Sequence, residues 1–502
     1  MADEMLFPVL GLPGELIRDL ALQNPWWENQ PFEVLPSFHR WPYDKLRQRL
    51  DKSMAPIVVV RGPRRIGKTI LQKQLIQSLL AEGVEPRRIL RVQFDELPSL
   101  KQARFAEPIL RIVEWFEKGV LHATLNAAAH RQEPAFLFFD EVQNLNGWDA
   151  QLKFLVDHAT VRVMVTGSSA LRIEMGRDSL AGRIHSLDVG PLRLTEIAAL
   201  RGFADLQPLQ PENGWPEWLQ PAFWRELTRH AVRQSSALER AFAAFSERGA
   251  YPWAHEHADA PWEEVADHLN ANVVRRVIEH DLRMGERGRK RDRQLLEEVF
   301  RMSCRYIGQA PNPATLASEA HRVLHANVGP QRIRHYLDFL DGSLLLRAIE
   351  PLEIRLKKRR GYSKLCLCDH AIRAAWLQEI VPLDRKNLDH APHLQDLAGR
   401  IAESTVGYFF ASLTGLSVAH LPERDDNPEV DFVLTIGERR IPVEVKYRRT
   451  IDPLRDTLGL RAFLEKSVNN APFGLLITRD DIPALDDPRI ITVSLPALLI
   501  VR

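Results

Sequence analysis

A glycine-bounded stretch near residue 65 has the composition of a phosphate-binding loop. It reads Gly62-Pro63-Arg64-Arg65-Ile66-Gly67-Lys68-Thr69. The two glycines let the backbone curl so that several N–H groups point inward, and the helix beginning near Lys68 adds its positive end. Lys68 would reach the β- and γ-phosphates of a nucleoside triphosphate, and the Thr69 hydroxyl would hold Mg²⁺.

A second element of the same chemistry lies at the end of an apolar run, at Asp140-Glu141. Asp140 would bind Mg²⁺ through water, and Glu141 would polarise the water that attacks the γ-phosphate. A third run ends at Thr166-Gly167-Ser168-Ser169, whose hydroxyls would lie near that phosphate. The alternative is an accidental loop and a helix cap at Asp140-Glu141, which the order of the three elements disfavours.

The predicted nucleotide-binding and catalytic residues therefore form one set, with Mg²⁺ held by Thr69 and Asp140. The set is Gly62, Pro63, Arg64, Arg65, Ile66, Gly67, Lys68, Thr69, Leu71, Asp140, Glu141, Thr166 and Ser168.

The surrounding pattern alternates strands and helices from about residue 50 to 200. Each strand is a continuous apolar run, which indicates a parallel sheet covered on both faces. The expected strands are 57–60, 89–94, 136–139 and 161–165, and a helix is expected over 69–80.

A second constellation of charged residues lies near the C-terminus, in a segment that reads as a hairpin. Gly437-Glu438 suits a two-residue type II′ turn, and this turn pairs Ile436 with Arg439. Counting back from the turn places Asp431 opposite Glu444 in a non-hydrogen-bonded pair, where Cα atoms approach to about 4.5 Å. Pro442 also falls in a non-bonded pair, so its missing N–H costs the hairpin nothing.

Opposed carboxylates destabilise a hairpin unless something neutralises them. Lys446 lies on the same face as Glu444. A divalent cation between Asp431 and Glu444 would resolve the repulsion and would suit metal-assisted phosphodiester hydrolysis. The alternative is that Lys446 neutralises a structural acidic pair in a fold that only binds.

The first constellation resembles a prokaryotic branch of the AAA-type ATPases. The resemblance rests on 138–143 (FFDEVQ), 166–169 (TGSS), 179–183 (SLAGR) and the start at 24–27 (NPWW). It implies that an arginine completes a neighbour's site, which we assign to Arg183 with Arg177 as second choice; the alternative is that Arg183 pairs with a core carboxylate. A homo-oligomer follows, either a dimer or a ring such as a hexamer.

The second constellation resembles the PD-(D/E)xK restriction-endonuclease-like superfamily, with Asp431, Glu444 and Lys446 as its core. That family often adds a glutamate from the preceding helix, and Glu403 occupies the matching place. The resemblance implies Mg²⁺ or Mn²⁺ held by Glu403, Asp431 and Glu444. A helix over about 454–468 and a strand over 473–477 complete the expected order, and such tails commonly follow this ATPase branch.

Residues 293–350 have the pattern of a winged helix, with helices over 293–306, from 314 and from 330, and a strand over 343–349. Gln331, Arg332, Arg334 and His335 would face solvent or DNA, while Ile333, Tyr336, Leu337 and Leu340 pack inward. Basic runs at 287–293 and 355–360 flank this unit. The predicted nucleic-acid contacts are Arg289, Lys290, Arg291, Arg332, Arg334, Lys357 and Lys358.

Composition limits the class of protein. The 502 residues are 45% hydrophobic and 26% charged with a net charge of +1, as in ordinary globular proteins. The three cysteines form no zinc pattern, and Cys366 and Cys368 fit a buried strand. An acidic N-terminus and the absence of an apolar run of about 18 residues favour a cytoplasmic protein.

The predicted fold is multidomain α/β. It has an N-terminal extension (1–45), an AAA-type P-loop core with a parallel sheet (46–200), a helical lid (201–290), a winged-helix unit (291–355) and a restriction-endonuclease-like domain (356–502). The predicted function is an ATP-hydrolysing motor that acts on DNA, by branch migration or processing of DNA structures. The alternative is an ATP-regulated assembly or switch protein whose tail only binds nucleic acid or partners.

Overall fold

The computed structural model describes most of the chain in two compact units. The described ranges are 11–30, 33–51, 55–103, 105–167, 179–203, 205–210, 215–281, 292–353, 361–423, 428–482 and 485–502. The first unit is Met1–Pro63 with Gly67–Val189, and the second is Arg64–Ile66 with Gly190–Arg502. Within these ranges, no helix combines the length and apolar character of a membrane span.

The first unit is built on a five-stranded sheet in the order β2-β3-β4-β1-β5, with every neighbouring pair parallel. The strands are β1 Ile57–Arg61, β2 Ile89–Gln93, β3 Phe136–Asp140, β4 Arg162–Gly167 and β5 Ile184–Asp188. The four predicted strands and their parallel arrangement are confirmed. The strand β5 was not predicted, because an edge strand that is half-buried on most positions lacks a continuous apolar run.

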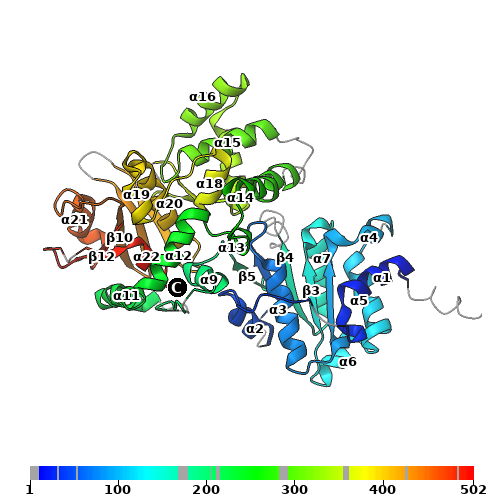
Figure 1. Cartoon of the computed structure of the whole chain (residues 1–502). Helices are drawn as coiled ribbons and strands as arrows, with labels where there is room; N and C mark the ends of the chain where they lie inside the picture. Colours follow the sequence, from blue (N-terminus) through cyan, green and yellow to red (C-terminus); the bar gives the residue numbers. More distant parts are fainter. Residues whose placement is uncertain are drawn as a thin grey trace, which may run out of the picture. The chain divides into compact units, whose positions relative to one another are not determined.

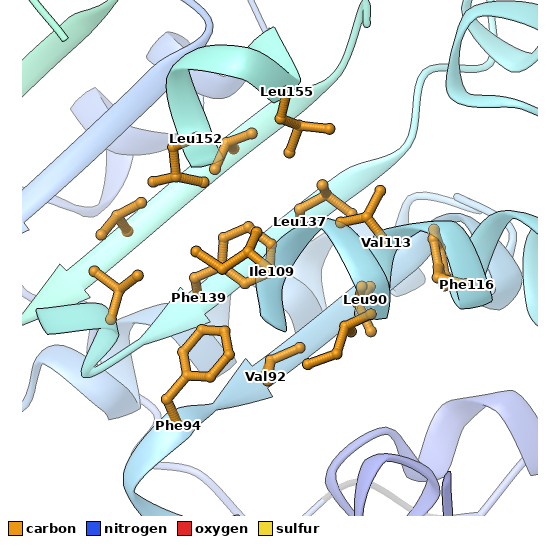
Figure 2. Packing of buried hydrophobic residues seen from close by; sticks show 14 of the residues in the cluster. Leu90, Val92, Phe94, Ile109, Val113, Phe116, Leu137, Phe139, Leu152 and Leu155 are labelled. Atoms are coloured by element: carbon orange, nitrogen blue, oxygen red, sulfur yellow. The ribbon is translucent and has the colours of Figure 1, made fainter. Parts of the chain in front are cut away.

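Helices cover both faces of this sheet (Figure 1). They are α1 Gly14–Gln23, α2 Tyr43–Asp51, α3 Lys68–Ala81, α4 Pro98–Ala103, α5 Pro108–Phe116, α6 Leu125–His130 and α7 Trp148–His158, with short helical turns η2 Pro25–Glu28, η3 Pro86–Arg88, η4 Phe94–Glu96, η5 Glu117–Leu121 and η6 Val142–Asn144. The main apolar core lies between β2, β3, α5 and α7, as Figure 2 shows for Leu90, Leu137, Ile109, Val113, Leu152 and Leu155.

Because successive strand residues face opposite sides, the alternate residues of β2 and β3 face α3 instead. Arg91 and Asp140 belong to that second set, together with Thr166 of β4. Arg91, Asp140 and Thr166 therefore lie on the side of the helix that follows the phosphate-type loop.

The open edge of β2 is capped by side chains of the N-terminal segment. The side-chain amide of Asn24 bonds both polar groups of the Arg91 peptide, donating to its carbonyl at 2.8 Å and accepting from its N–H at 2.7 Å. Gln23 bonds the Gln93 peptide in the same way, and the indoles of Trp26 and Trp27 donate to the Ile89 carbonyl. Side chains thus satisfy alternate residues of β2 as a sixth strand would, which protects an edge prone to pairing.

The second unit begins with helices, as predicted for residues 200–300. They are α9 Leu194–Leu200, α10 Trp215–Trp218, α11 Pro221–Arg233, α12 Ser235–Arg248, α13 Pro252–Glu256, α14 Trp262–Leu269, η7 Asn270–Val274 and η8 Val277–Asp281. Then follow α15 Arg293–Arg305, α16 Pro313–Leu324, α17 Pro330–Gly342 and the antiparallel strands β6 Leu346–Ile349 and β7 Lys364–Leu367. The prediction that the strand starts at Ser343 was wrong, because Leu344 has a left-handed backbone (φ 62°) in the turn that ends α17.

The second sheet has the order β12-β11-β10-β9-β8, antiparallel from β8 to β10 and parallel from β10 to β12. Its strands are β8 Ser417–Leu421, β9 Val430–Ile436, β10 Arg439–Lys446, β11 Gly474–Thr478 and β12 Ile490–Ser494. The accompanying helices are α18 His370–Leu377, α19 Arg385–Asp389, η10 Pro392–Leu394, α20 Gln395–Ala411, α21 Leu458–Leu464, η11 Ser467–Asn469 and α22 Leu495–Leu498.

The predicted hairpin register is confirmed as far as the pair of Phe432 with Val443. Ile436 lies opposite Arg439, and the pairing continues through Val433 with Pro442 to Phe432 with Val443. Gly437 has φ 60° while Glu438 is not among the residues of positive φ, which matches a type II′ turn. The helix predicted over 454–468 is shorter, at Leu458–Leu464, because residues 452–457 form a turn in which the Asp452 carboxylate accepts the Leu454 and Arg455 N–H groups.

Removing the cap on β2 tests its energetic role. Asn24→Ala leaves the buried N–H and carbonyl of Arg91 without partners, and we expect it to lower the free energy of unfolding of the first unit by about 2–4 kcal/mol. Urea denaturation measures the change. Gln30→Ala, an exposed amide in the same segment, is the control and should have almost no effect; equal losses in the two variants would contradict the cap.

Candidate functional site

The turn between β1 and α3 has the geometry of a phosphate-binding loop. It leaves β1 after Arg61 and enters α3 at Lys68, with left-handed backbone at Arg65 (φ 62°) and Gly67 (φ 87°). The Lys68 ammonium donates to the carbonyls of Gly62 and Pro63 at 3.0 and 2.7 Å, which folds its side chain back over the loop. The first N–H groups of α3 have no partner within the helix and point out of its N-terminus.

Asp140 ends β3 beside this loop and is fully buried. One carboxylate oxygen accepts the Thr69 hydroxyl at 2.8 Å, and the other accepts the Thr166 hydroxyl. The three predicted elements therefore meet, because the carboxyl ends of parallel strands lie at one edge of the sheet. Ile66 and Leu71 are buried, Arg64 is half-buried and Arg65 is exposed, while Ser168 lies outside the described residues.

Glu141, the residue after Asp140, has a left-handed backbone (φ 51°), which non-glycine residues seldom adopt. Its N–H donates to the Asp140 carboxylate at 3.1 Å, and the Gln143 side-chain amide donates to its own carboxylate. Such backbone strain costs about 1–3 kcal/mol and concentrates at functional sites. The strained turn fixes where this second carboxylate lies relative to Asp140.

Arg91 is a site residue that the sequence interpretation missed. It is buried on β2, and its guanidinium lies 3.7 Å from the Asp140 carboxylate while donating to the Gln72 side chain of α3 at 3.1 Å. Burial lowers the pKa of Arg91, and the attraction of Asp140 opposes that shift. The only signal in the sequence is a charge inside the apolar run 89–92, which marks a buried residue that needs a partner.

Asp95, just after β2, adds a third carboxyl group near this edge. Burial and the neighbouring charges of Glu141 and Asp140 raise the pKa of Asp95 above its usual value. Because these carboxyl groups repel one another, the site attracts cations.

Arg183 lies at the amino ends of the strands, whereas the loop and Asp140 lie at their carboxyl ends. Its carbonyl accepts the N–H of Ile57, the first residue of β1, whereas the loop follows the last residue of β1. Its guanidinium forms a two-pronged ion pair with Asp157 of α7 at 2.5 and 3.0 Å. Arg183 therefore does not reach the loop of its own unit, and a role at a nucleotide requires a second copy of the chain. Arg177 lies outside the described residues.

The chemistry of the first site fits a nucleotide with Mg²⁺. A hydroxyl and a carboxylate oxygen converge at 2.8 Å beside the N-terminus of α3, and Mg²⁺ binds through one or two such oxygen ligands, water and phosphate oxygens. Lys68 supplies the positive charge for the outer phosphates.

The second candidate site is an acidic cluster in the second unit. Carboxylate oxygens of Glu403 on α20, Glu429 before β9 and Asp431 on β9 all lie within 4.8 Å of one another and could hold a metal ion. Asp431 also accepts the N–H of Val445 at 2.9 Å. The predicted meeting of Glu403 with Asp431 is observed, and Glu429 is a member that the sequence interpretation did not select.

Glu444 and Lys446 complete this cluster. The Lys446 ammonium donates to one Glu444 oxygen. Burial and the nearby Asp431 raise the pKa of Glu444 to about 8. Burial opposes the ammonium of Lys446, but Glu444 and Asp431 outweigh it and raise the pKa of Lys446.

A lysine that was not predicted lies inside the cluster. The Lys364 ammonium of β7 donates to Glu403, and to Glu429 and Asp431 at 3.1 Å each. The metal ion expected between Asp431 and Glu444 stays a prediction, and two lysines of the chain already pair with these carboxyl groups: Lys364 with Asp431 and Lys446 with Glu444. Burial disfavours the charged form of Lys364, but the attraction of Asp431, Glu403 and Glu429 outweighs burial and raises the pKa of Lys364 well above its usual value.

The remaining carboxyl groups respond to these charges. Burial and the proximity of Asp431 raise the pKa of Glu403 well above its usual value. Burial also opposes ionisation of Asp431, but Lys364 and Lys446 outweigh it and lower the pKa of Asp431. The cluster thus lowers the pKa of one carboxyl group, Asp431, and raises the pKa of two others, Glu403 and Glu444.

The helix predicted from residue 330 is observed as α17. Gln331, Arg332, Arg334 and His335 are exposed, whereas Ile333, Tyr336, Leu337 and Leu340 are buried, as predicted. The basic residues Arg289, Lys290, Arg291, Lys357 and Lys358 lie outside the described residues.

Two family matches cover parts of the chain. Residues 54–198 match the family described as an AAA domain, which confirms the AAA-type ATPase domain predicted for the first unit. Residues 239–381 match a family described as a domain of unknown function (DUF8612).

Two curated relatives match most of the chain. One, from Methanocaldococcus jannaschii, is 24% identical over 400 residues, 79% of this chain and 77% of its own length. The other, from Haemophilus influenzae, is 22% identical over 399 residues, 78% and 82% of the two chains. Both are described only as uncharacterised proteins, so they add no activity.

Solved structures with some similarity include two from Thermotoga maritima. Domain III of the replication initiation protein DnaA is 14% identical over 35% of this chain and 71% of that chain, with a TM-score of 0.22. The RuvB Holliday junction branch migration motor is 13% identical over 68% and 95%, with a TM-score of 0.28. Similarities at these scores decide nothing about this chain.

Arg91 gives a test of the first site. The Arg91 guanidinium lies beside the Asp140 carboxylate and stabilises its charge. We therefore expect Arg91→Met to lower kcat for ATP hydrolysis about 10–100-fold and to raise the Mg²⁺ concentration needed for half-maximal activity, with a smaller change in KM. Steady-state phosphate release over a Mg²⁺ series measures both. The control is Arg88→Met, which removes a guanidinium that donates to the Pro134 carbonyl. It should leave kcat and the Mg²⁺ requirement unchanged. An equal Mg²⁺ requirement in Arg91→Met and the parent would refute the role of Arg91.

Proposed function

We propose that this chain is a Mg²⁺-dependent ATPase whose AAA-type first unit hydrolyses ATP to ADP and phosphate. The observation that carries the proposal is the 2.8 Å contact between the Thr69 hydroxyl and the buried Asp140 carboxylate, beside the loop that begins α3. A hydroxyl and a carboxylate so placed next to helix N–H groups form the metal-binding half of a phosphoryl-transfer site.

Each residue has a distinct part in this reaction. The loop N–H groups and Lys68 would bind the phosphates and stabilise the charge that develops as the γ-phosphoryl group leaves. Glu141 would orient the attacking water and accept its proton, from the strained position that follows Asp140. Thr166 would hold the Asp140 carboxylate, and Ser168 would add a hydroxyl near the γ-phosphate. Bound Mg²⁺, held by Thr69 and Asp140, would neutralise charge on the β- and γ-phosphates.

A homo-oligomer completes this proposal. Arg183 lies at the edge of the sheet away from its own loop, so it could stabilise transition-state charge only at the site of an adjacent copy. The Arg183 guanidinium would leave Asp157 and bind a phosphate of the nucleotide on the adjacent copy. ATP hydrolysis would then depend on oligomer assembly. A dimer and a hexamer both allow this.

Glu141 provides the direct test of hydrolysis. Glu141→Gln removes the proton acceptor while keeping shape, so we expect kcat to fall about 10²–10⁴-fold with ATP still bound. Lys68→Ala should weaken ATP binding itself. Phosphate release and equilibrium binding of a fluorescent ATP analogue separate the two effects. Glu133→Gln, the same change on an exposed residue, is the control, and an unimpaired kcat in Glu141→Gln would reject the assignment.

The second unit supports a proposal that the ATPase acts on DNA. Helices α15, α16 and α17 followed by β6 and β7 have the order of a winged helix, and α17 exposes Arg332 and Arg334 beside a buried apolar face. In the proposed restriction-endonuclease-like domain, Glu403 of α20 would act together with Asp431, Glu444 and Lys446 of the second sheet. These residues could hold Mg²⁺ or Mn²⁺ for phosphodiester cleavage. ATP turnover would then drive movement or processing of DNA structures.

The competing proposal is an ATP-regulated switch whose tail binds without cutting. The ion pairs of Lys364 with the acidic cluster favour it over cleavage for this arrangement of side chains. ATP hydrolysis that responds to single-stranded, duplex or four-way DNA supports the motor. Hydrolysis indifferent to every DNA structure supports the switch.

The exposed arginines of α17 give a quantitative test of DNA contact. Each phosphate contact contributes about one unit to the dependence of log affinity on log salt, so Arg332→Ala with Arg334→Ala should reduce that slope by about two. Fluorescence anisotropy with labelled duplex over a salt series measures it. Arg322→Ala, an exposed arginine of α16, is the control for general charge, and an unchanged slope in the double variant would contradict DNA contact through α17.

A further inference from the structure

The acidic cluster of the second unit contains a cation supplied by the chain itself. The side chain of Lys364 is almost fully buried, and its ammonium contacts Glu403, Glu429 and Asp431. The ammonium also lies 5.2 Å from the centre of the Phe432 ring, whose face attracts positive charge. An ammonium has three hydrogen-bond donors, and the three carboxylates use all of them.

These three carboxylates are the same groups whose oxygens lie close enough to hold a metal ion. A divalent cation would need oxygens at about 2.0–2.6 Å, including those that now accept from Lys364. Two cations in one buried space repel each other strongly. The ammonium and a metal ion are therefore mutually exclusive occupants of the cluster.

A second observation indicates that the lysine does not satisfy the whole site. The Glu444 oxygen that does not bond Lys446 is buried and has no hydrogen-bond partner in the part of the chain that the structure describes. An unpaired buried carboxyl oxygen costs free energy. A metal ion held by Asp431 and Glu444 would use it, whereas Lys364 makes no hydrogen bond or ion pair with Glu444 among the described residues and contacts Asp431 through one oxygen.

The strand that carries Lys364 is not part of the second sheet. It is β7, which pairs with β6 directly after α17. The segment after β6 is tied to β8, since Leu352 donates to the His420 carbonyl at 2.7 Å and His420 donates to the Glu350 carbonyl at 3.1 Å. This tie keeps the segment beside the second sheet, so the ammonium of Lys364 leaves the cluster only if β7 itself moves away from Asp431 and Glu403.

We propose that Lys364 is a resident cation that excludes divalent metal from the cluster of Glu403, Glu429 and Asp431, so that the nuclease-like site takes up metal only when this lysine leaves. The inference rests on the metal-binding role proposed above for that site. In this proposal β7 has a regulatory function, because its Lys364 keeps the cleavage site folded and charge-compensated but without metal. Withdrawal of β7 would open it.

Mn²⁺ binding to the full-length chain without nucleotide tests this directly. The free-Mn²⁺ signal in electron paramagnetic resonance gives the bound fraction for the parent, Lys364→Met and Lys364→Met with Asp431→Asn. Lys386→Met removes an exposed lysine of α19 and is the matched control. We expect Lys364→Met to gain one Mn²⁺ site at least about tenfold tighter than any in the parent or control, and the Asp431→Asn double variant to lose it.

If Lys364→Met is unstable, its thermal unfolding at increasing Mn²⁺ concentration gives a second measure of metal binding. Without lysine the cluster has excess negative charge, so Lys364→Met should have a lower Tm that rises with Mn²⁺, because a ligand of the folded state stabilises it. The parent's Tm should not respond. A Lys364→Met chain that stays unfolded at every Mn²⁺ concentration contradicts the proposal.

The other outcomes separate this inference from the proposed function. If the parent binds Mn²⁺ at the cluster and Asp431→Asn abolishes it, Lys364 does not exclude metal, while the metal-dependent site stands. If neither the parent nor Lys364→Met gains a site that depends on Asp431, both the inference and the cleavage site are wrong. The ATPase proposal is independent of either result.

Discussion

The first unit depends on how it accommodates one buried carboxylate. Asp140 has no exposed surface, and an ionised group in that position is expensive unless each oxygen has a partner. Thr69 and Thr166 donate to the two oxygens, and Arg91 supplies a positive charge behind them. These partners come from α3, β4 and β2, so satisfying Asp140 fixes the relative position of the loop helix and three neighbouring strands.

This requirement extends to the edge of the sheet. Arg91 can face Asp140 only if β2 keeps its register, and Asn24 bonds both polar groups of the Arg91 peptide. The segment at 24–27 thus supports the site through the strand it caps. Positioning of a catalytic carboxylate by residues that touch neither substrate nor metal is common in phosphoryl-transfer sites.

The second unit solves a similar problem with lysine. Asp431 is buried among other carboxyl groups, and Lys364 and Lys446 compensate its charge. Buried ion pairs of this kind contribute little net stability, yet removing one partner is costly. A cluster balanced in this way can stay folded without metal.

The sequence predicted those parts of the sites whose positions follow from local rules. The loop around Lys68, the carboxylate at Asp140 and the register set by Gly437 all depend on neighbours in the chain. Arg91 and Lys364 could not be placed, because their partners are brought together by the pairing of strands distant in sequence.

The same limit applies to edge strands and to charges inside apolar runs. The strand β5 was missed because an exposed edge weakens the apolar pattern. A charge within a buried strand predicts that a partner exists without saying which residue it is. Long-range pairing, more than local propensity, therefore decides what the sequence leaves open.

In the function proposed above, Asp140 and Thr69 hold the metal that accompanies ATP. The most direct measurement is the affinity for ATP with and without Mg²⁺, in the parent and in Asp140→Asn, by equilibrium titration. We expect Mg²⁺ to tighten ATP binding about tenfold or more in the parent and to have little effect on ATP binding in Asp140→Asn. Equal responses to Mg²⁺ in the two proteins, or no ATP binding by the parent, would contradict it.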